Sequence, residues 1–312
     1  MAPRILTLTL NPTVDVACDA DAVRAVRKVR TRDERYDPGG GGVNVSRVVR
    51  ELGGETLAVV LAGGLPGSEL RALLDAADVP HRAIPIAGRT RLSLTVNDLS
   101  ARREYRFVPE GPELSEAEWR AALAVLEAEP AEWVVASGSL PRGVPAGFYA
   151  EAAAIAARRG QRFVLDTSGA ALKAALGHGL ALIKPSRGEF ETLVGRPLPT
   201  PKAQAEAARA LLQEGAAERI VVTLGHQGAL MAGPEGLIRL PALTVPEQGA
   251  VGAGDSFLAA MVLSLSRGED PREAFAWGLA AGAAAVMQAG TAAPRREDVV
   301  ALRQRIGPVA QP

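Results

Sequence analysis

The sequence is poor in the residues from which disulfide frameworks, zinc centres and base-stacking surfaces are built. A lone cysteine, Cys18, excludes an intramolecular disulfide framework and any multi-cysteine metal site. Three widely separated histidines (His81, His178 and His226) disfavour a histidine-rich zinc centre. Aromatic residues make up only 4% of the chain, so stacking platforms for single-stranded nucleic acid are hard to assemble.

The chain also lacks an excess of charge of either sign and any long apolar run. It has 35 Lys and Arg against 35 Asp and Glu, which disfavours a nucleic-acid binder that relies on bulk basicity. The longest apolar tract, Trp277–Met287, is shorter than the roughly 18 residues of a membrane span. Ile5–Leu10 is too short and too often interrupted by Thr for a signal peptide. We therefore expect a cytoplasmic protein with neither a nucleic-acid nor a membrane partner.

What is present is a hydrophobic content of 47% over 312 residues, which excludes a disordered chain and allows a core of several layers. Short apolar runs typical of buried strands alternate with segments of helical periodicity. The predicted strands are Ile5–Leu10, Thr56–Ala62, Trp133–Ala136, Arg162–Asp166, Leu180–Lys184 and Arg219–Leu224. The predicted helices are Val45–Leu52, Glu116–Glu127, Phe148–Ala157, Ala203–Leu212, Phe257–Leu265 and Pro271–Met287. This alternation predicts an α/β fold with a mainly parallel sheet covered by helices on both faces.

Two stretches break this rhythm. Arg24–Arg35 alternates charged and apolar residues, and Arg91–Asn97 and Arg103–Val108 form a second alternating pair around a plausible turn. Such alternation indicates a sheet with one solvent-exposed face. We expect a small sheet that projects from the main body.

The segment Gly252-Ala253-Gly254-Asp255 is followed by an apolar helix. Glycines before a helix allow backbone N–H groups to converge on an anion at its positive end. A carboxylate at that position could deprotonate a hydroxyl, which suits phosphoryl transfer to an alcohol. The alternative is that Asp255 only caps the helix.

A second glycine-rich segment runs from Gly39 to Gly42 and continues to Asn44 and Arg47. Four consecutive glycines suggest a close approach of the chain to a ligand, and Asn44 can offer an amide to ligand hydroxyls. The alternative is a flexible hinge before an ordinary helix. Neither the Gly-Lys-Ser/Thr phosphate loop nor a convincing dinucleotide-binding glycine motif is present.

These two segments, in this order, resemble the two signature regions of the ribokinase-like, or PfkB, carbohydrate kinases. The resemblance runs nearly end to end and is strongest to the phosphofructokinase branch, through Thr7–Asp15, Gly39–Arg47, Tyr105-Arg106-Phe107, Ser137–Pro141 and Leu224–Ala229. It implies a three-layer α/β/α fold with a mainly parallel central sheet. It also implies one kinase domain over residues 1–312, with lid strands within 12–36 and 89–108.

The resemblance further implies a set of residues that bind the sugar. Asp15 would accept sugar hydroxyls, and the sugar pocket would be lined by Gly39, Gly40 and Asn44. Lys28 and Arg91, placed on the two projecting strand regions, would hold an existing phosphate on the sugar, and Ser139 would contact the substrate. Without the family match, exposed Lys and Arg on an edge strand would be read as solubilising.

The catalytic and nucleotide-binding residues follow in the same way. The resemblance makes Asp255 the general base, with the N–H groups of Gly252, Ala253 and Gly254 as the anion hole. The residues expected to contact ATP are Lys184, Ser186, Thr223, Gly225, Gly252, Leu279 and Ala283. Asp166 and Glu189 are expected to arrange Mg²⁺ through water. For Leu279 and Ala283, ordinary core packing is an equally good interpretation.

Three departures from the family pattern affect these expectations. Ser186 replaces the Asn of an Asn-x-x-Glu motif, which predicts a looser metal and water network. Gly249-Ala250 replaces the usual Asp-Thr, which leaves a potassium site doubtful. Gly41 stands where relatives acting on fructose 1-phosphate or tagatose 6-phosphate often have Lys, which favours fructose 6-phosphate.

The expected reaction is transfer of the γ-phosphoryl group of ATP to the 1-hydroxyl of fructose 6-phosphate. The alternatives are a kinase acting on tagatose 6-phosphate or fructose 1-phosphate, and a non-catalytic sensor of sugar phosphates or nucleotides. A homodimer through the lid is also expected, because apolar residues recur along the lid at Val26, Val29, Leu92 and Leu94.

Overall fold

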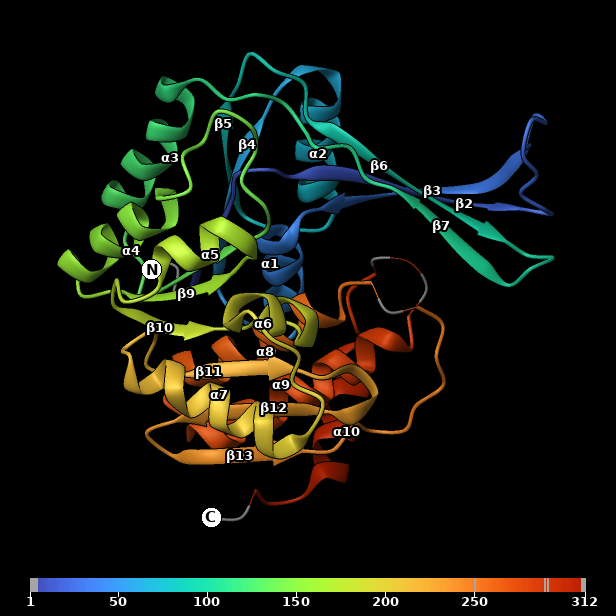
Figure 1. The fold of residues 1–312 in the computed structure, drawn as a ribbon. Coiled ribbons are helices and arrows are strands. Elements are labelled where there is room, and N and C mark those ends of the chain that lie inside the picture. The colour runs from blue at the N-terminus through green and yellow to red at the C-terminus, as the bar shows by residue number, and fades with distance from the viewer. Residues whose placement is uncertain (1–4, 250, 289, 291, 310–312) are drawn as a thin grey trace.

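A computed structural model describes residues 5–249, 251–288, 290 and 292–309. Its main body is a nine-stranded sheet between two layers of helices (Figure 1). In order across the sheet the strands are β13 (Gly236–Leu240), β12 (Ala229–Gly233), β11 (Ile220–Thr223), β10 (Leu180–Ile183), β9 (Arg162–Asp166), β8 (Trp133–Ser137), β1 (Ile5–Thr9), β4 (Thr56–Ala62) and β5 (His81–Pro85). The strands from β11 to β5 pair in parallel, whereas β12 pairs antiparallel with both of its neighbours, β11 and β13. The predicted mainly parallel sheet is therefore confirmed.

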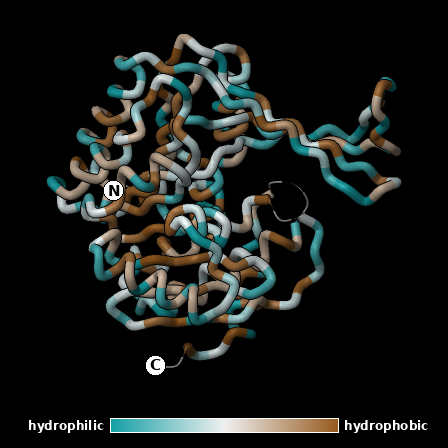
Figure 2. The backbone as a smooth tube through the Cα atoms, viewed as in Figure 1, coloured by the Kyte–Doolittle hydropathy of each residue, from teal (hydrophilic) through white to brown (hydrophobic). Residues whose placement is uncertain are grey.

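The central strands are buried on both faces because successive side chains enter opposite hydrophobic clusters. On β1, Leu6 and Leu8 pack into one cluster while Ile5 packs into the other. The first cluster is covered by α3 (Glu116–Ala128), α4 (Phe148–Arg158), α5 (Gly169–Ala175), α6 (Arg187–Val194) and α7 (Pro201–Gln213). The second is covered by α1 (Gly41–Glu51), α8 (Ala253–Ser266), α9 (Pro271–Val286) and α10 (Arg296–Ile306). Apolar residues accordingly concentrate inside the body in Figure 2.

Local sequence signals define where several helices begin. The Ser115 hydroxyl caps α3 in a capping box with Glu118, Thr200 caps α7 and Asp270 caps α9. A proline stands in the first turn of α7 and α9, where its missing N–H costs nothing. In the described part of the chain, no helix is both long and apolar enough to cross a bilayer.

A second sheet of four strands projects from the body (Figure 1). Its order is β3 (Thr31–Gly39), β2 (Thr13–Ala20), β6 (Arg91–Asp98) and β7 (Arg103–Phe107). The β6–β7 hairpin matches the prediction, with its turn held by the Asp98 carboxylate, which accepts from the Ser100 hydroxyl and the Ala101 N–H. Helix α2 (Gly64–Ala76) packs beside β2 and β3.

The prediction of a strand at Arg24–Arg35 is wrong in its position. Residues 21–30 form a loop, and β3 starts at Thr31. The alternation of apolar and charged residues was misleading because Val26 is fully exposed on this loop and has a positive φ of 61°. The strand itself shows no burial pattern over Thr31–Tyr36. That residues 1–312 form one domain stays a prediction.

Candidate active site

The candidate site lies at the carboxyl ends of the parallel strands, the edge at which open α/β sheets bind ligands. Polar side chains follow consecutive strands of the sheet there. Ser137 and Asp166 end β8 and β9, Lys184 directly follows β10, and Thr223 ends β11. The topology thus gathers residues that are up to 86 positions apart in the sequence along a single edge.

The two glycine-rich segments meet at the start of α8. Asn44, on the first turn of α1, donates a 2.9 Å hydrogen bond from Nδ2 to Oδ2 of Asp255, on the first turn of α8. Burial, together with the negative charge of Asp166, raises the pKa of Asp255 to about 7, although the Asn44 hydrogen bond lowers it. A carboxyl group with a pKa near neutrality is matched to general acid–base work. An Asp that only caps a helix would not need a pKa raised to this value.

The turn before Asp255 has the geometry of an anion hole. Gly252 precedes the helix with a φ of 75°, a left-handed conformation that favours glycine. The first helical hydrogen bond runs from the Ser256 N–H to the Gly252 carbonyl at 2.8 Å. The amides of Ala253 and Gly254 therefore precede the helical ladder, at the positive end of the helix dipole.

Lys184 brings a buried positive charge to the same place. Its Nζ lies 3.2 Å from Oδ2 of Asp166, and a Cβ on Gly254 would lie 3.2 Å from the same Nζ. Burial lowers the pKa of Lys184, but the charges of Asp166 and Asp255 outweigh it and the net pKa is raised. Lys184 is therefore charged and adjoins the start of α8.

A cavity of about 810 Å³ extends from this point between α6, α8 and α9. Five residues predicted to contact ATP line it: Ser186, Thr223, Gly225, Leu279 and Ala283. Ala253 and Gly254 also line it, whereas Lys184 and Gly252 are not among the lining residues. The cavity is large enough for a nucleotide-sized ligand, and its apolar wall includes Phe257.

Ser186 and Glu189 form a capping box at the start of α6. The Glu189 Oε2 accepts from the Ser186 N–H at 2.8 Å and from its hydroxyl at 2.7 Å. The sequence suggested a looser arrangement because Ser lacks the amide of Asn. The structure shows Glu189 bonded to the cap of its own helix, and the looser metal and water network stays a prediction.

The carboxylates of this region fit a divalent cation held through water. Burial and the charge of Glu189 raise the pKa of Asp166, while the ion pair with Lys184 lowers it, so the Asp166 carboxylate lies near both a second carboxylate and a buried cation. Within the described ranges, no group of three or more His, Cys, Asp or Glu side chains is close enough to enclose a metal ion. A magnesium ion here would take most of its ligands from phosphate and water, as this cation commonly does.

The sugar-binding residues predicted from the sequence mostly gather where the small sheet leaves the body. A Cβ on Gly39 would lie only 2.2 Å from Oδ2 of Asp15, so glycine is required there for the carboxylate to fit. Burial raises the pKa of Asp15, while the charges of Arg106, Arg47 and Arg91 oppose this rise. A partly buried carboxylate among arginines can accept sugar hydroxyls while the arginines attract an anion.

Arg91 and Ser139 are joined to this group, whereas Lys28 is not. Arg91 donates from Nη2 to the Asn11 carbonyl and from Nη1 to the Pro109 carbonyl, each at 2.9 Å. The Ser139 hydroxyl accepts a 3.2 Å hydrogen bond from Nδ2 of Asn11. Lys28 was expected on a strand but lies exposed in the loop of residues 21–30. Its place beside the sugar is thus not supported within one copy of the chain.

Two residues of this region were not identified from the sequence. Arg106, on β7, lies close enough to Asp15 to affect its pKa, and Asn11 contacts both Arg91 and Ser139. Arg106 lies in one of the segments that carry the family resemblance, but its alternating strand does not separate a binding Arg from a solubilising one. Asn11 had a weak signal, because it follows a buried strand at the edge where ligands bind.

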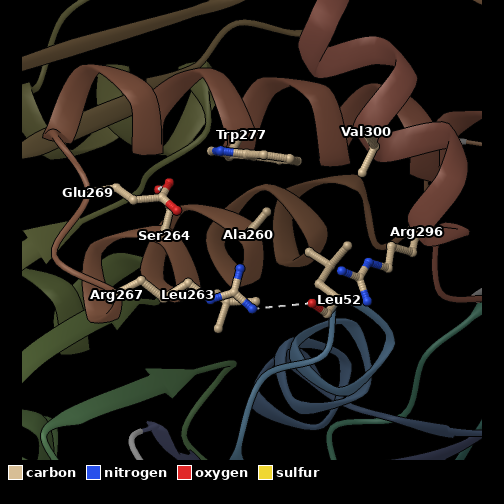
Figure 3. A pocket seen from close by; sticks show the side chains of 9 residues that line it. All are labelled: Leu52, Ala260, Leu263, Ser264, Arg267, Glu269, Trp277, Arg296 and Val300. Atoms are coloured by element: carbon tan, nitrogen blue, oxygen red, sulfur yellow. Dashed lines mark hydrogen bonds between the residues drawn. The ribbon is translucent and has the colours of Figure 1, made fainter.

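Two further features lie outside this group. The cavity of about 60 Å³ in Figure 3 is lined by Leu52, which follows α1, by residues of α8, α9 and α10 such as Trp277 and Arg296, and by no predicted site residue. The doubtful potassium site depends on Gly249 and Ala250, and Ala250 lies outside the described residues.

Comparisons with known proteins agree with this geometry. A model of the pfkB family carbohydrate kinases matches residues 8–298. The ATP-dependent 6-phosphofructokinase isozyme 2 of Mycobacterium tuberculosis is 46% identical over 299 residues, which cover 95% of this chain and 88% of that protein. A crystal structure of Escherichia coli phosphofructokinase-2 with potassium superposes with a TM-score of 0.94 at 36% identity. The complex of the same enzyme with fructose-6-phosphate gives 0.92 at 36% identity, and each covers 98% of this chain and 100% of the other.

Proposed function

Because the chain belongs to the pfkB family of carbohydrate kinases, we propose that it is an ATP-dependent 6-phosphofructokinase. It transfers the γ-phosphoryl group of ATP to the 1-hydroxyl of fructose 6-phosphate. One observation carries the proposal: at the start of α8, Asp255 directly follows Ala253 and Gly254 of the cavity wall and accepts the hydrogen bond of Asn44, a residue assigned to the sugar pocket. The names of the relatives support the choice of acceptor.

In this reaction Asp255 is the general base. Its Oδ accepts the proton of the 1-hydroxyl as the hydroxyl oxygen attacks the γ-phosphorus, and the bond from phosphorus to the bridging oxygen of ADP breaks. Asn44 orients the carboxylate through its 2.9 Å hydrogen bond. A pKa near 7 leaves Asp255 substantially ionised at neutral pH and still basic enough to take a proton.

The charge that develops on the transferred group meets fixed positive partners. The amides of Gly252, Ala253 and Gly254 point from the helix start, and Lys184 adjoins them. Asp166 and Glu189 would hold Mg²⁺ through water, and the ion, when bound, neutralises negative charge on the phosphates. Leu279 and Ala283 pack against the adenine, and Ser186, Thr223 and Gly225 line the nucleotide cavity around it.

On the sugar side, Asp15 accepts hydroxyls, and Gly39, Gly40 and Asn44 shape the pocket. Arg91 and Ser139 hold the 6-phosphate, and Arg106 adds positive charge. Lys28 can take part only from a second copy, because its own loop is exposed and projects from the body (Figure 1).

A homodimer through the small sheet is part of the same proposal. Large apolar side chains on this sheet are exposed, among them Leu92, Leu94 and Phe107. Contiguous exposed apolar residues on a sheet commonly mark an interface. Val26 is also exposed, whereas Val29 packs against a small cluster around Cys18 and is not available.

A potassium site near Gly249 and a cytoplasmic location also remain proposals. The potassium complex of the E. coli enzyme supports the first, and the use of ATP supports the second.

The proposal is tested by measuring ADP release with ATP and Mg²⁺ against fructose 6-phosphate, tagatose 6-phosphate, fructose 1-phosphate and free fructose. We expect the highest kcat/KM with fructose 6-phosphate. A higher value with another acceptor would reassign the substrate. Absence of turnover with every acceptor would overturn the enzyme assignment and favour a sensor.

A further inference from the structure

A buried polar cluster around Asn11 joins the two sheets. The Asn11 side chain is only 4% exposed and lies two residues after β1. Its Nδ2 donates to the Glu110 carbonyl at 2.8 Å and to the Ser139 hydroxyl at 3.2 Å. Its own carbonyl accepts from Nη2 of Arg91 at 2.9 Å. One residue therefore contacts both side chains that are proposed to hold the sugar's phosphate.

The hydrogen bonds of this cluster have a defined direction. Because Asn11 donates to the Ser139 oxygen, the Ser139 O–H proton remains available for another acceptor. Arg91 directs its two terminal nitrogens to the main-chain carbonyls of Asn11 and Pro109, which fixes the plane of the guanidinium. The cluster thus presents donors, and donors recognise an anion.

The cluster is also incomplete. The Asn11 Oδ1 and the Arg91 Nε are buried, and neither has a hydrogen-bond partner among the described residues. Buried polar groups in native proteins are nearly always paired, so an unpaired donor and an unpaired acceptor in one cluster call for an explanation. Both atoms belong to the cluster that joins Arg91 to Ser139, so the described residues alone do not satisfy the polar groups of this subsite.

The backbone is shaped around Asn11 as well. A Cβ on Gly111 would lie 2.2 Å from the Asn11 Oδ1, and Gly111 has a φ of 98°. Thr13, two residues beyond Asn11, donates from its hydroxyl to the Arg91 carbonyl at 3.2 Å. Asn11 therefore lies where three segments meet: the one before β2, the start of β6 and the one after β7.

We propose that Asn11 is the positioning residue of the sugar-phosphate subsite. It holds Arg91 and Ser139 at a fixed spacing and sets the direction of the Ser139 hydroxyl, so that the site prefers an acceptor that carries a phosphate. This inference rests on the proposed function. It assigns no contact with the reacting atoms to Asn11.

The isosteric variant Asn11→Asp reverses the polarity of the cluster. A carboxylate would accept the Ser139 proton, oppose the Glu110 carbonyl, attract Arg91 and repel a phosphate. We expect the KM for fructose 6-phosphate to rise about tenfold or more, with kcat changing much less, because charge-assisted hydrogen bonds to the ground state are lost. The KM for ATP and the low kcat/KM for unphosphorylated fructose should both stay within about twofold.

The matched control is Gln204→Glu, a buried amide on α7 that bonds the Leu198 carbonyl and Arg239 away from the site. It should leave the KM for fructose 6-phosphate unchanged. An unchanged KM in Asn11→Asp would overturn the inference. The inference would also be overturned if kcat/KM for fructose fell, the KM for ATP rose and the unfolding midpoint fell in parallel. That pattern belongs to a merely structural residue.

A double-mutant cycle keeps the inference testable if Asn11→Asp fails to fold. Asn11→Ala and Ser139→Ala should each raise the KM for fructose 6-phosphate, and together they should raise it by clearly less than the product of the two effects. Fully multiplicative effects would show that Asn11 does not act through Ser139, contrary to the proposal.

Calorimetric titration with fructose 6-phosphate in the absence of nucleotide separates this inference from the proposed function. Asn11-dependent binding without transfer would overturn the proposed function alone. Normal turnover in the wild type with binding that is indifferent to Asn11 would overturn the inference alone. Absence of binding to the wild type would overturn both.

Discussion

Replacing Asp255 by Asn should stabilise the protein at neutral and alkaline pH. The pKa of Asp255 is raised from 3.8 to about 7, chiefly by burial and by the charge of Asp166. At about 1.4 kcal/mol for each pH unit between the folded and unfolded pKa, full ionisation of Asp255 costs the folded state about 4 kcal/mol. The Asn side chain resembles the protonated carboxyl group and is free of that cost.

The sign and the pH window follow from linkage. Between about pH 4 and pH 7 the folded state retains a proton on Asp255 that the unfolded state has lost, so the stability of the wild type falls as the pH rises through this window. The advantage of Asp255→Asn should be near zero at pH 4, grow steadily, and level off at about 4 kcal/mol above pH 7.

The assay is thermal unfolding of the two proteins across pH 4 to 8.5. For a chain of this length each kcal/mol shifts the midpoint by a few degrees, so the difference should reach on the order of 10 °C at pH 8. Asn44→Asp offers no such gain, because it places a second carboxylate beside Asp255. A difference between wild type and Asp255→Asn that is independent of pH, or that is largest at pH 4, would refute the reasoning.

Three further outcomes follow from the same geometry. Asn44→Ala removes a hydrogen bond that lowers the pKa of Asp255, so the acid limb of the pH profile of kcat/KM should move above pH 7. An acid limb that stays in place or moves to lower pH would contradict this role of Asn44. Lys184→Met leaves Asp166 buried without its cation, so it should lower the free energy of unfolding by about 3–5 kcal/mol and raise the KM for ATP. An unchanged free energy of unfolding and an unchanged KM for ATP would argue against the ion pair. Gly39→Ala should raise the KM for the sugar phosphate but not for ATP, because its Cβ would collide with Oδ2 of Asp15, and an unaffected sugar KM would exclude this contact.

A matched control accompanies the glycine variant. Gly147 caps α4 with a φ of −75°, and a Cβ there would meet no atom within 4 Å among the described residues. Gly147→Ala should therefore leave both Michaelis constants unchanged.

The main sheet could be predicted from the sequence because its strands are buried on both faces. Thr56–Ala62 and Arg162–Asp166 coincide with β4 and β9. The β12–β13 hairpin was missed, since its two strands are short and each contains glycine, and β13 lies at the edge of the sheet. Helix α2 was missed because Gly64, Pro66 and Gly67 obscure its first turn.

The small sheet was harder to place than the main sheet. In β3 the side chains from Thr31 to Tyr36 are all exposed, so no periodic burial exists for a pattern to report. The charged and apolar alternation upstream belongs to a loop that carries Lys28 and Val26. The start of β3 at Thr31 therefore cannot be located from the spacing of apolar residues, because the first six residues of this strand are exposed.

The site shows the same division between local and long-range information. Asp255 and Asn44 were both singled out by their glycine-rich surroundings, but the hydrogen bond between residues 211 positions apart depends on the fold. Glu189 was identified, whereas its capping box with Ser186 was not recognised as such. Asn11 and Arg106 act through neighbours that only the folded chain supplies.

The most direct test of the account is the kcat of Asp255→Asn with saturating ATP, Mg²⁺ and fructose 6-phosphate at pH 8. Loss of a positioned base predicts a fall of about 10²–10⁴-fold while calorimetry still detects binding of the sugar phosphate. A kcat within a fewfold of the wild type would show that Asp255 does not take the proton, and the proposed chemistry would be wrong.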